Sequence, residues 1–473
     1  MSSAETFQKA QFTRVNAAFT AMSGALSKPD PQVFGKLTRL SGMRLEVSGL
    51  RARVGARCWI ETGHRKGIVA EVVGFEGSQL ILMCEGVAAG LMPGAKVTVL
   101  GDGESIIAGD HLLGRIIDGA GTPLDGLPPA TGQFVASRGE AISPMSRKSI
   151  TEPLDVGIRA INSLLTIGRG QRMGLFAGSG VGKSTLLGMM TRFTDADVVV
   201  VGLVGERGRE VREFVEESLG PEGLARSVVV ATPADTSPLM RVAGCWRATA
   251  IAEHFRDQGK NVLLLMDSLT RFAQAQREIG LAAGEPPVSR GYTPSVFAAL
   301  PNLIERAGNV GDGSITAVYT VLVEGDDLQD PIADAARAIL DGHIVLSRTM
   351  AEAGVYPAID LEASISRIML QITQSEQQEA ARLIKELFAT HRANQDLISV
   401  GAYRMGADAK IDRAINSYTD IIDFIRQPLT DRVGLDEGRT ALSTLANDAL
   451  VTQTIEPVGQ ALSSPPAPHP QPR

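Results

Sequence analysis

Residues 173–190 read MGLFAGSGVGKSTLLGMM, and this stretch decides the fold of the central part of the chain. The apolar run 173–176 predicts a buried strand, and the apolar residues that follow Ser184 predict a helix. Between them lies a glycine-rich loop that ends in Lys183 and Ser184. A strand, a glycine-rich loop and a helix in this order are typical of a phosphate-binding loop.

The residue types of this loop suit a nucleotide. Glycines let successive backbone N–H groups turn toward phosphates, and the following helix presents its positive end. We expect Lys183 to reach the β- and γ-phosphates and the Ser184 hydroxyl to ligate Mg²⁺. A dinucleotide fold is disfavoured, because a lysine has no role in that motif. The residues predicted to bind nucleotide here are Gly178, Ser179, Gly180, Val181, Gly182, Lys183, Ser184 and Thr185.

Two further apolar runs end in acidic residues. The run 262–266 leads into Asp267, and an acid at the carboxyl end of a buried strand is placed to act on Mg²⁺. The run 198–203 leads through Gly205 into Glu206, which predicts a general base or water-positioning residue. The pattern alone leaves a second interpretation of Glu206 open, as part of a solvated charge cluster that opens a helix.

Working outward, the pattern of apolar residues predicts five segments. Short β-rich runs predict a small barrel, alternating strands and helices predict a doubly wound, mostly parallel sheet, and three- and four-residue spacing predicts helices at both ends. No strand is expected beyond Ser364. The segments are an N-terminal amphipathic helix (1–30), a β-barrel (31–100), a nucleotide-binding core (101–363), a helical domain (364–450) and a disordered proline-rich tail (451–473). The strands expected are 43–47, 67–75, 79–83 and 96–100 in the barrel, and 173–176, 198–203, 227–231, 262–266 and 314–323 in the core.

Composition narrows the class of protein. The 473 residues carry a net charge of −7, so the chain offers nucleic acid no general attraction. The three cysteines are scattered, which disfavours a disulfide framework or a thiolate metal site. No export signal or membrane-length apolar run is recognised, and we expect a soluble protein of the cytoplasm.

Several motifs together resemble a known family. Gly-Glu-Arg at 205–207, Asp-Ser-Leu-Thr-Arg at 267–271 and the stretches 325–331 and 355–367 look like the catalytic subunits of rotary F-type and V-type ATPases. More narrowly, the stretches 169–176 and 336–348 resemble the flagellum-specific type III export ATPases. The resemblance covers roughly residues 35 to 430, and it implies a RecA-like core between a β-barrel and a helical domain.

The resemblance also implies catalytic roles. Lys183 and Ser184 would hold phosphates and Mg²⁺, and Glu206 would be the catalytic carboxylate. Arg207 would assist Glu206, and Asp267 would be the acid in the second coordination shell of Mg²⁺.

Three further positions, Tyr356, Leu429 and Arg367, can be compared with the adenine pocket and the subunit interface of the family. Tyr356 lies where the family stacks an aromatic ring on adenine; the alternative is a ring merely packed between its neighbours. The stretch 424–429 resembles the loop that closes the adenine pocket, but Leu429 stands in place of the expected aromatic, so the resemblance does not extend to that contact. Arg367 would be an arginine finger that reaches into a neighbouring subunit; the alternative is a surface ion-pair residue.

Taken together, the sequence predicts a Mg²⁺-dependent ATP hydrolase that energises type III protein export, with flagellar export favoured. An injectisome ATPase and a rotary synthase subunit are the nearest alternatives. A hexameric RNA translocase and a non-catalytic assembly protein are more distant. The resemblance implies a homo-oligomer, expected to be a hexamer, at the inner membrane's export apparatus. Its expected partners are a stator-like protein on the N-terminal helix, a stalk-like protein, the export gate, and export chaperones with their substrates.

Overall fold

The computed structural model describes residues 33–63, 66–102, 105–139, 142–323 and 329–451, together with Thr13. The chain divides into two compact units, with the boundary between Gly103 and Glu104. Apart from Thr13, the predicted N-terminal helix lies outside the described residues, as do the tail beyond Val451 and residues 325–328 of the family motifs.

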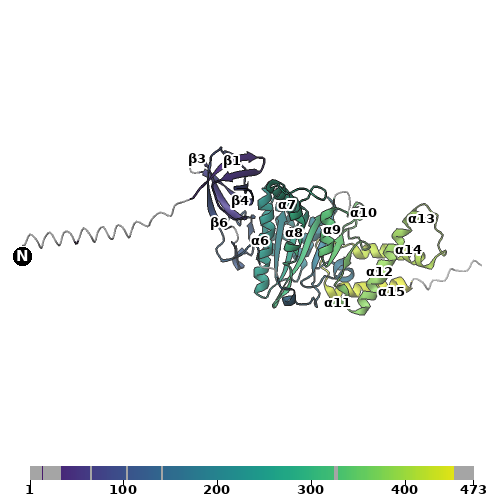
Figure 1. Ribbon diagram of the computed structural model, residues 1–473. Helices are drawn as coiled ribbons and strands as arrows, with labels where there is room; N and C mark the ends of the chain where they lie inside the picture. Colours follow the sequence, from purple (N-terminus) through teal and green to yellow (C-terminus); the bar gives the residue numbers. More distant parts are fainter. Residues whose placement is uncertain are drawn as a thin grey trace, which may run out of the picture. The chain divides into compact units, whose positions relative to one another are not determined.

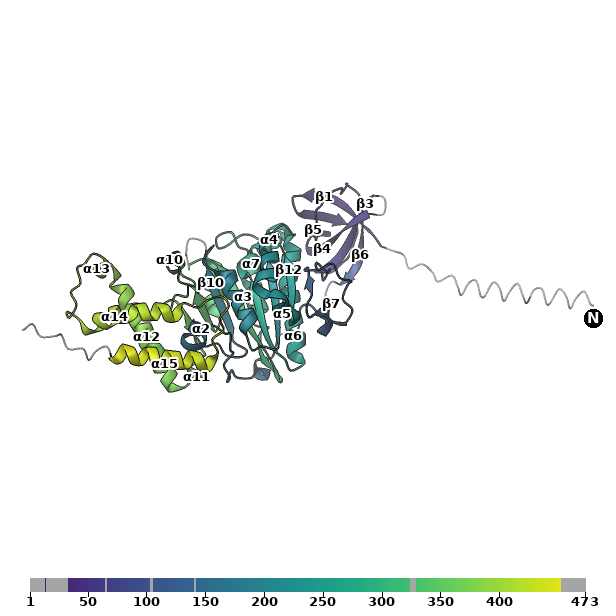
Figure 2. The same cartoon turned by 180° about the vertical axis from the view of Figure 1, so that it is seen from behind.

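The first unit is a closed antiparallel barrel (Figures 1 and 2). Its strands run in the order β1-β2-β5-β4-β3-β6, and β6 pairs back with β1. The predicted barrel is confirmed, although the pattern missed β1 and β3. In β1 only Gly35 and Leu37 are buried, so its apolar alternation is too short to recognise. The strands are β1 (Gly35–Ser41), β2 (Arg44–Ser48), β3 (Ala56–Gly63), β4 (Lys66–Glu76), β5 (Gln79–Cys84) and β6 (Lys96–Asp102).

The second unit is built on a sheet in the order β17-β16-β10-β15-β13-β11-β12-β8. All neighbouring strands on this path are parallel except β17, and the short β14 pairs antiparallel with β15. The predicted doubly wound parallel core is confirmed. The strands of this unit are β7 (Ser105–Ala108), β8 (Ile116–Ile117), β9 (Gln133–Ala136), β10 (Arg172–Ala177), β11 (Val198–Val204), β12 (Ser227–Thr232), β13 (Asn261–Asp267), β14 (Gly308–Val310), β15 (Gly313–Leu322), β16 (Gly342–Val345) and β17 (Ile365–Ser366).

Both faces of this sheet are covered, because successive side chains of a strand point to opposite sides. In β13, Leu263 and Leu265 join a core with α2, α3, α12, α14 and α15, whereas Leu264 and Met266 join a core with α6 to α9. The helices are α2 (Arg159–Leu164), α3 (Lys183–Phe193), α4 (Gly208–Glu213), α5 (Gly220–Ala225), α6 (Pro238–Asp257), α7 (Leu269–Ala283), α8 (Pro294–Ile304), α9 (Pro331–Ile339), α10 (Arg348–Glu352), α11 (Met369–Ile372), α12 (Ser375–Ala393), α13 (Gln395–Ser399), α14 (Ala409–Ile425) and α15 (Leu435–Val451), with a π-helical segment at Phe214–Leu219 and 3₁₀ turns at Asp110–Leu112 and Pro144–Ser146.

The C-terminal part is helical, as predicted, with one correction. The expectation that no strand follows Ser364 is wrong, because Ile365 and Ser366 form β17 against β16. Two residues are too few to show an alternating pattern, and the strand exists only because the edge of β16 offers backbone partners. This short strand places the residue after it, Arg367, at the edge of the sheet.

Candidate active site

The phosphate-binding loop connects β10 to α3. β10 lies between β16 and β15 in the sheet, and α3 begins at Lys183. Gly180 and Gly182 have φ angles of 78° and 90°, a left-handed conformation that favours glycine. Ser184, in the first turn of α3, is exposed. The loop therefore has the backbone geometry that the motif predicts, with its hydroxyl open to a ligand.

Three of the predicted catalytic residues meet at the carboxyl ends of the strands. The Nζ atom of Lys183 donates to both carboxylate oxygens of Asp267 at 2.6 Å and to Oε1 of Glu206 at 3.0 Å. Asp267 ends β13 and Glu206 follows β11, and the two strands are adjacent. The side chains of all three are largely buried. The sequence separates these residues by up to 84 positions, and the parallel sheet brings them together.

Opposing electrostatic effects act on Lys183 and Asp267. Burial lowers the pKa of Lys183, but the neighbouring carboxylates of Asp267 and Glu206 more than offset that effect and raise it. Burial raises the pKa of Asp267, and the Lys183 ammonium opposes that rise. A lysine held by two carboxylates at the start of α3 can exchange those partners for phosphate oxygens. The Ser184 hydroxyl and the Asp267 carboxylate are oxygen donors, which is the donor type that Mg²⁺ requires.

Two residues near this cluster had no role in the sequence analysis. Oγ1 of Thr320, a buried residue of β15, donates to Oδ1 of Asp267 at 2.6 Å. No motif marks Thr320, because only the pairing of β15 with β13 places it there.

Arg271 is the second such residue. A Cβ atom on Gly205 would lie 2.8 Å from Cβ and Cγ of Arg271, so its stem covers the turn before Glu206. Its Nη1 donates to Gln274 at 2.9 Å, whereas its buried Nε has no hydrogen-bond partner within the described part of the chain. Its position in the 267–271 motif was the available signal.

Tyr356 lies beside the phosphate-binding loop. A Cβ atom on Gly182 would lie 3.3 Å from two ring carbons of Tyr356, so the ring covers this glycine. The backbone N–H of Gln427 donates to the Tyr356 carbonyl at 2.9 Å, which joins the 424–429 stretch to the same place. Leu429 is half-exposed, and its carbonyl accepts from Arg192 of α3 at 3.0 Å.

The two predicted catalytic arginines lie outside the Lys183 cluster. The Arg207 side chain is 80% exposed, and its nearest acid is Glu210 at 3.7 Å. Arg367 is also exposed and donates to the carbonyl of Arg337 at 3.3 Å.

Strand register explains why Arg367 is remote from its own loop. Ser366 pairs with Gly342, and Gly342 pairs with Met173 near the amino end of β10. The phosphate-binding loop leaves the other end of β10 after Ala177. At about 3.3 Å per residue, the length of β10 separates them by about 16 Å. Within one chain, Arg367 therefore lies at the amino ends of the parallel strands, which we call the amino edge of the sheet. Lys183 lies at their carboxyl ends, which we call the carboxyl edge.

Comparison with known families identifies two matching regions. The family model described as the ATP synthase alpha/beta family, nucleotide-binding domain, matches residues 157–366. The model described as the T3SS EscN ATPase C-terminal domain matches residues 373–444.

Comparison with whole proteins finds relatives that align with this chain over most of both lengths. The "Flagellum-specific ATP synthase" of Pseudomonas aeruginosa is 58% identical over 89% of this chain and 95% of that protein. The Salmonella typhimurium protein of the same name is 54% identical over 92% of this chain and 99% of that protein. The "Type 3 secretion system ATPase" of Xanthomonas euvesicatoria is 49% identical over 88% and 94% of the two chains.

Solved structures agree with the fold. The assembled ATPase EscN from the type III secretion system of enteropathogenic E. coli superposes with a TM-score of 0.83 at 44% identity. The match covers 87% of this chain and all of EscN. A second structure, of EscN in complex with its central stalk EscO, matches with a TM-score of 0.79 at 43% identity over the same shares of the two chains.

Proposed function

This chain belongs to the ATP synthase α/β family and, within it, to the flagellar and type III secretion ATPases, and from this premise we propose how its own residues act. It hydrolyses ATP, and the hydrolysis energises type III protein export. The relatives at 58% and 54% identity are flagellar, so flagellar export is the favoured assignment, ahead of injectisome secretion.

One observation carries the catalytic proposal: Lys183 lies between Glu206 and Asp267 at hydrogen-bond distance from both. When ATP binds the loop, Lys183 exchanges these carboxylates for β- and γ-phosphate oxygens. Glu206 is then free to orient and polarise the attacking water. Arg207 assists Glu206, which requires its exposed side chain to turn toward the loop.

The Ser184 hydroxyl and the Asp267 carboxylate would hold Mg²⁺ together with the nucleotide phosphates. When bound, this ion neutralises charge on the β- and γ-phosphate oxygens. Thr320 keeps one Asp267 oxygen in place through its hydrogen bond. Gly178 to Gly182 and Thr185 surround the phosphates, and the Tyr356 ring, which covers Gly182, forms one wall for the adenine.

We propose that Arg367 acts in trans, in the active site of a second copy of this chain. Its exposed side chain and its position at the sheet edge opposite Lys183 support this assignment. An arginine supplied by a neighbour stabilises charge that develops on the γ-phosphoryl group. A ring of identical copies, which we take to be six, then has one active site at each interface.

The assembly proposal extends to partners. EscN has been solved with its central stalk EscO, and we propose a corresponding stalk-like partner for this ring. A stator-like protein on residues 1–30, the export gate, and chaperones with their export substrates are further proposed partners, as is peripheral contact with the inner membrane. Among the residues that the structure describes, no helix is both long and apolar enough to cross a bilayer.

Mixing two inactive variants tests the trans arrangement. Lys183→Ala removes the loop half of a site, and Arg367→Ala removes the finger half. Each variant alone should lose turnover, by about 10³- to 10⁵-fold for the arginine. Mixed rings should recover part of the activity, because some interfaces combine two intact halves. Phosphate release is measured at several mixing ratios, with ring formation checked by sedimentation. Rings that form without any recovery would exclude the trans role.

A further inference from the structure

We propose that Gln171 is a positioning residue for Arg367, so that it acts on the active site of the neighbouring subunit and not on that of its own. The proposal rests on the trans role of Arg367. Gln171 directly precedes β10, the strand that leads into the phosphate-binding loop, so the sequence favours the opposite assignment.

The contacts of Gln171 converge on the backbone around Arg367. Gln171 is fully buried, and its Nε2 donates to Oγ of Ser366 at 3.1 Å and to the Asp341 carbonyl at 3.3 Å. The same nitrogen lies 3.2 Å from Sδ of Met173 in β10, and this contact is the route by which it would act on its own loop. The same Asp341 carbonyl accepts from the N–H of Arg367 at 3.0 Å. Oγ of Ser366 in turn donates to the Thr166 carbonyl at 2.8 Å. One side-chain amide therefore holds the residue before Arg367 and the carbonyl that binds Arg367 itself.

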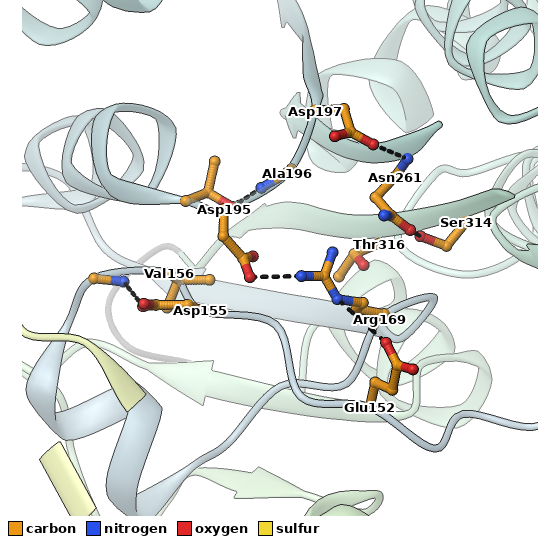
Figure 3. A network of polar contacts seen from close by, with 12 residues as sticks. Glu152, Asp155, Val156, Arg169, Asp195, Ala196, Asp197, Asn261, Ser314 and Thr316 are labelled. Carbon is orange, nitrogen blue, oxygen red and sulfur yellow. Dashed lines mark hydrogen bonds and ion pairs between the residues drawn. The ribbon is translucent and has the colours of Figure 1, made fainter. Parts of the chain in front are cut away.

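The turn that carries Gln171 is itself fixed. Oε1 of Gln171 accepts from the N–H of Gly168 at 2.8 Å, and Oγ1 of Thr316 accepts from the N–H of Gly170 at 2.8 Å. Between these two glycines, the Arg169 side chain donates to Asp195 at 2.5 Å and lies 3.8 Å from the Glu152 carboxylate (Figure 3). The turn is thus tied to β15 and to the segment before β11, and it offers a rigid base.

The other supports of Arg367 are equally constrained. Arg172 donates to the two carboxylate oxygens of Asp341 at 2.9 and 3.0 Å, which fixes the residue whose carbonyl binds Arg367. A Cβ atom on Gly168 would lie 3.4 Å from Cγ2 of Ile368, so the residue after Arg367 packs on the turn. The finger thus has a buried platform at the amino edge of the sheet. Since a displacement of about 1 Å can cost about 10²-fold in rate, a shift of this platform that moves Arg367 by that distance would lower turnover measurably.

Complementation distinguishes the two possible directions of action. If Gln171 positions Arg367, Gln171→Leu is defective in the finger half. Mixing it with Lys183→Ala should then recover activity, and mixing it with Arg367→Ala should not. If Gln171 acts through β10 on its own loop, the two mixtures should behave in the reverse way.

The experiment measures phosphate release by these mixed rings, together with binding of a fluorescent ATP analogue. Gln171→Leu alone should lower turnover by about 10²-fold, with nucleotide affinity within about twofold of the parent chain. Recovery with Arg367→Ala, or no recovery with either partner in rings that form, overturns the proposal. The Lys183→Ala and Arg367→Ala mixture serves as the reference: if it fails, the trans role itself is wrong, whatever Gln171 does.

A second variant covers the case in which Gln171→Leu does not fold. Ser366→Ala removes the hydroxyl that accepts the hydrogen bond from the Gln171 amide. It should recover activity when mixed with Lys183→Ala but not with Arg367→Ala, and its own loss of turnover should be smaller than that of Gln171→Leu. Ser364→Ala is the matched control. Its buried hydroxyl accepts from the N–H of Val345 at 3.0 Å and does not contact Gln171. Removing it costs stability by leaving that N–H unpaired, but rings that form should keep their turnover within about twofold of the parent chain. If Ser366→Ala recovers activity with Arg367→Ala and not with Lys183→Ala, it behaves as a loop-half variant and the proposal is contradicted. A Ser366→Ala protein that loses no turnover also contradicts it.

Discussion

The carboxyl and amino edges of the central sheet are built in contrasting ways. At the carboxyl edge, Lys183, Glu206 and Asp267 are charged and satisfy one another. At the amino edge, beside the Arg172–Asp341 ion pair, Gln171 and Ser366 are buried and neutral, and they bond to each other and to the carbonyls of Asp341 and Thr166. The difference suits the two tasks that we propose: the first edge would exchange partners when nucleotide arrives, whereas the second would stay in place while it presents Arg367 to a neighbour.

The largest loss of turnover that tests this comparison is expected for Glu206→Gln, at the carboxyl edge. The amide keeps the shape of the side chain but cannot act as a base, so turnover should fall by about 10²- to 10⁴-fold while ATP still binds. Phosphate release and binding of a fluorescent ATP analogue are measured together. Glu210→Gln, four residues further along on α4, is the matched control. Normal hydrolysis by Glu206→Gln would remove Glu206 from the mechanism.

A smaller effect is expected for Thr320→Val, which keeps the shape of the side chain and removes the donor to Asp267. A hydrogen bond to a charged group contributes about 1.5–3 kcal/mol, so turnover should fall about 10- to 100-fold. The Mg²⁺ concentration for half-maximal activity should rise, because the carboxylate loses one of its supports. Thr320→Ser should restore both quantities. An unchanged Mg²⁺ requirement in the valine variant would show that Thr320 serves packing alone.

The smallest effect concerns a buried lysine beside β17, near the carboxyl end of β16, where Ser364 accepts from the N–H of Val345. Lys385 of α12 donates to the Ser364 carbonyl at 3.2 Å, and burial lowers its pKa to about 8. Between pH 8 and the ordinary value of 10.5, the unfolded chain holds more protons than the folded one, so stability should rise with pH. At pH 7 the buried charge is a cost of about 3 kcal/mol, because burial lowers the pKa from 10.5 to about 8. Lys385→Met removes this cost but also the bond to the Ser364 carbonyl, which contributes about 1.5–3 kcal/mol, so the free energy of unfolding should increase by about 1 kcal/mol.

Urea unfolding of the parent chain and of Lys385→Met between pH 7 and 10.5 measures both effects. The pH slope should be weaker in the variant, while Lys410→Met, which removes an exposed lysine on α14, should leave it unchanged. A less stable Lys385→Met protein at pH 7 would mean that the bond to Ser364 outweighs the cost of burying the charge.

The two edges also differ in how far the sequence predicts them. The carboxyl edge follows from local rules: a glycine-rich loop after a strand, and acids at strand ends, are visible within a few residues each. Thr320 escaped because a threonine inside a β-rich run has no distinguishing pattern. At the amino edge, Arg367 was predicted only through a family motif, and Gln171 and Asp341 were not predicted as site residues.

The sequence by itself predicted the parallel sheet, the barrel, the phosphate-binding loop with Lys183 and the strand-end acid Asp267, because these depend on apolar periodicity and short spacing. For Glu206 the same pattern left two interpretations open, and the family resemblance favoured the catalytic one. Tertiary structure alone decided the pairing of Lys183 with both acids, the two-residue strand at Ile365–Ser366 and the bond from Gln171 to Ser366. The physical reason is distance along the chain. Gln171 and Ser366 are 195 residues apart, and only the register of neighbouring strands brings an amide and a hydroxyl to 3.1 Å.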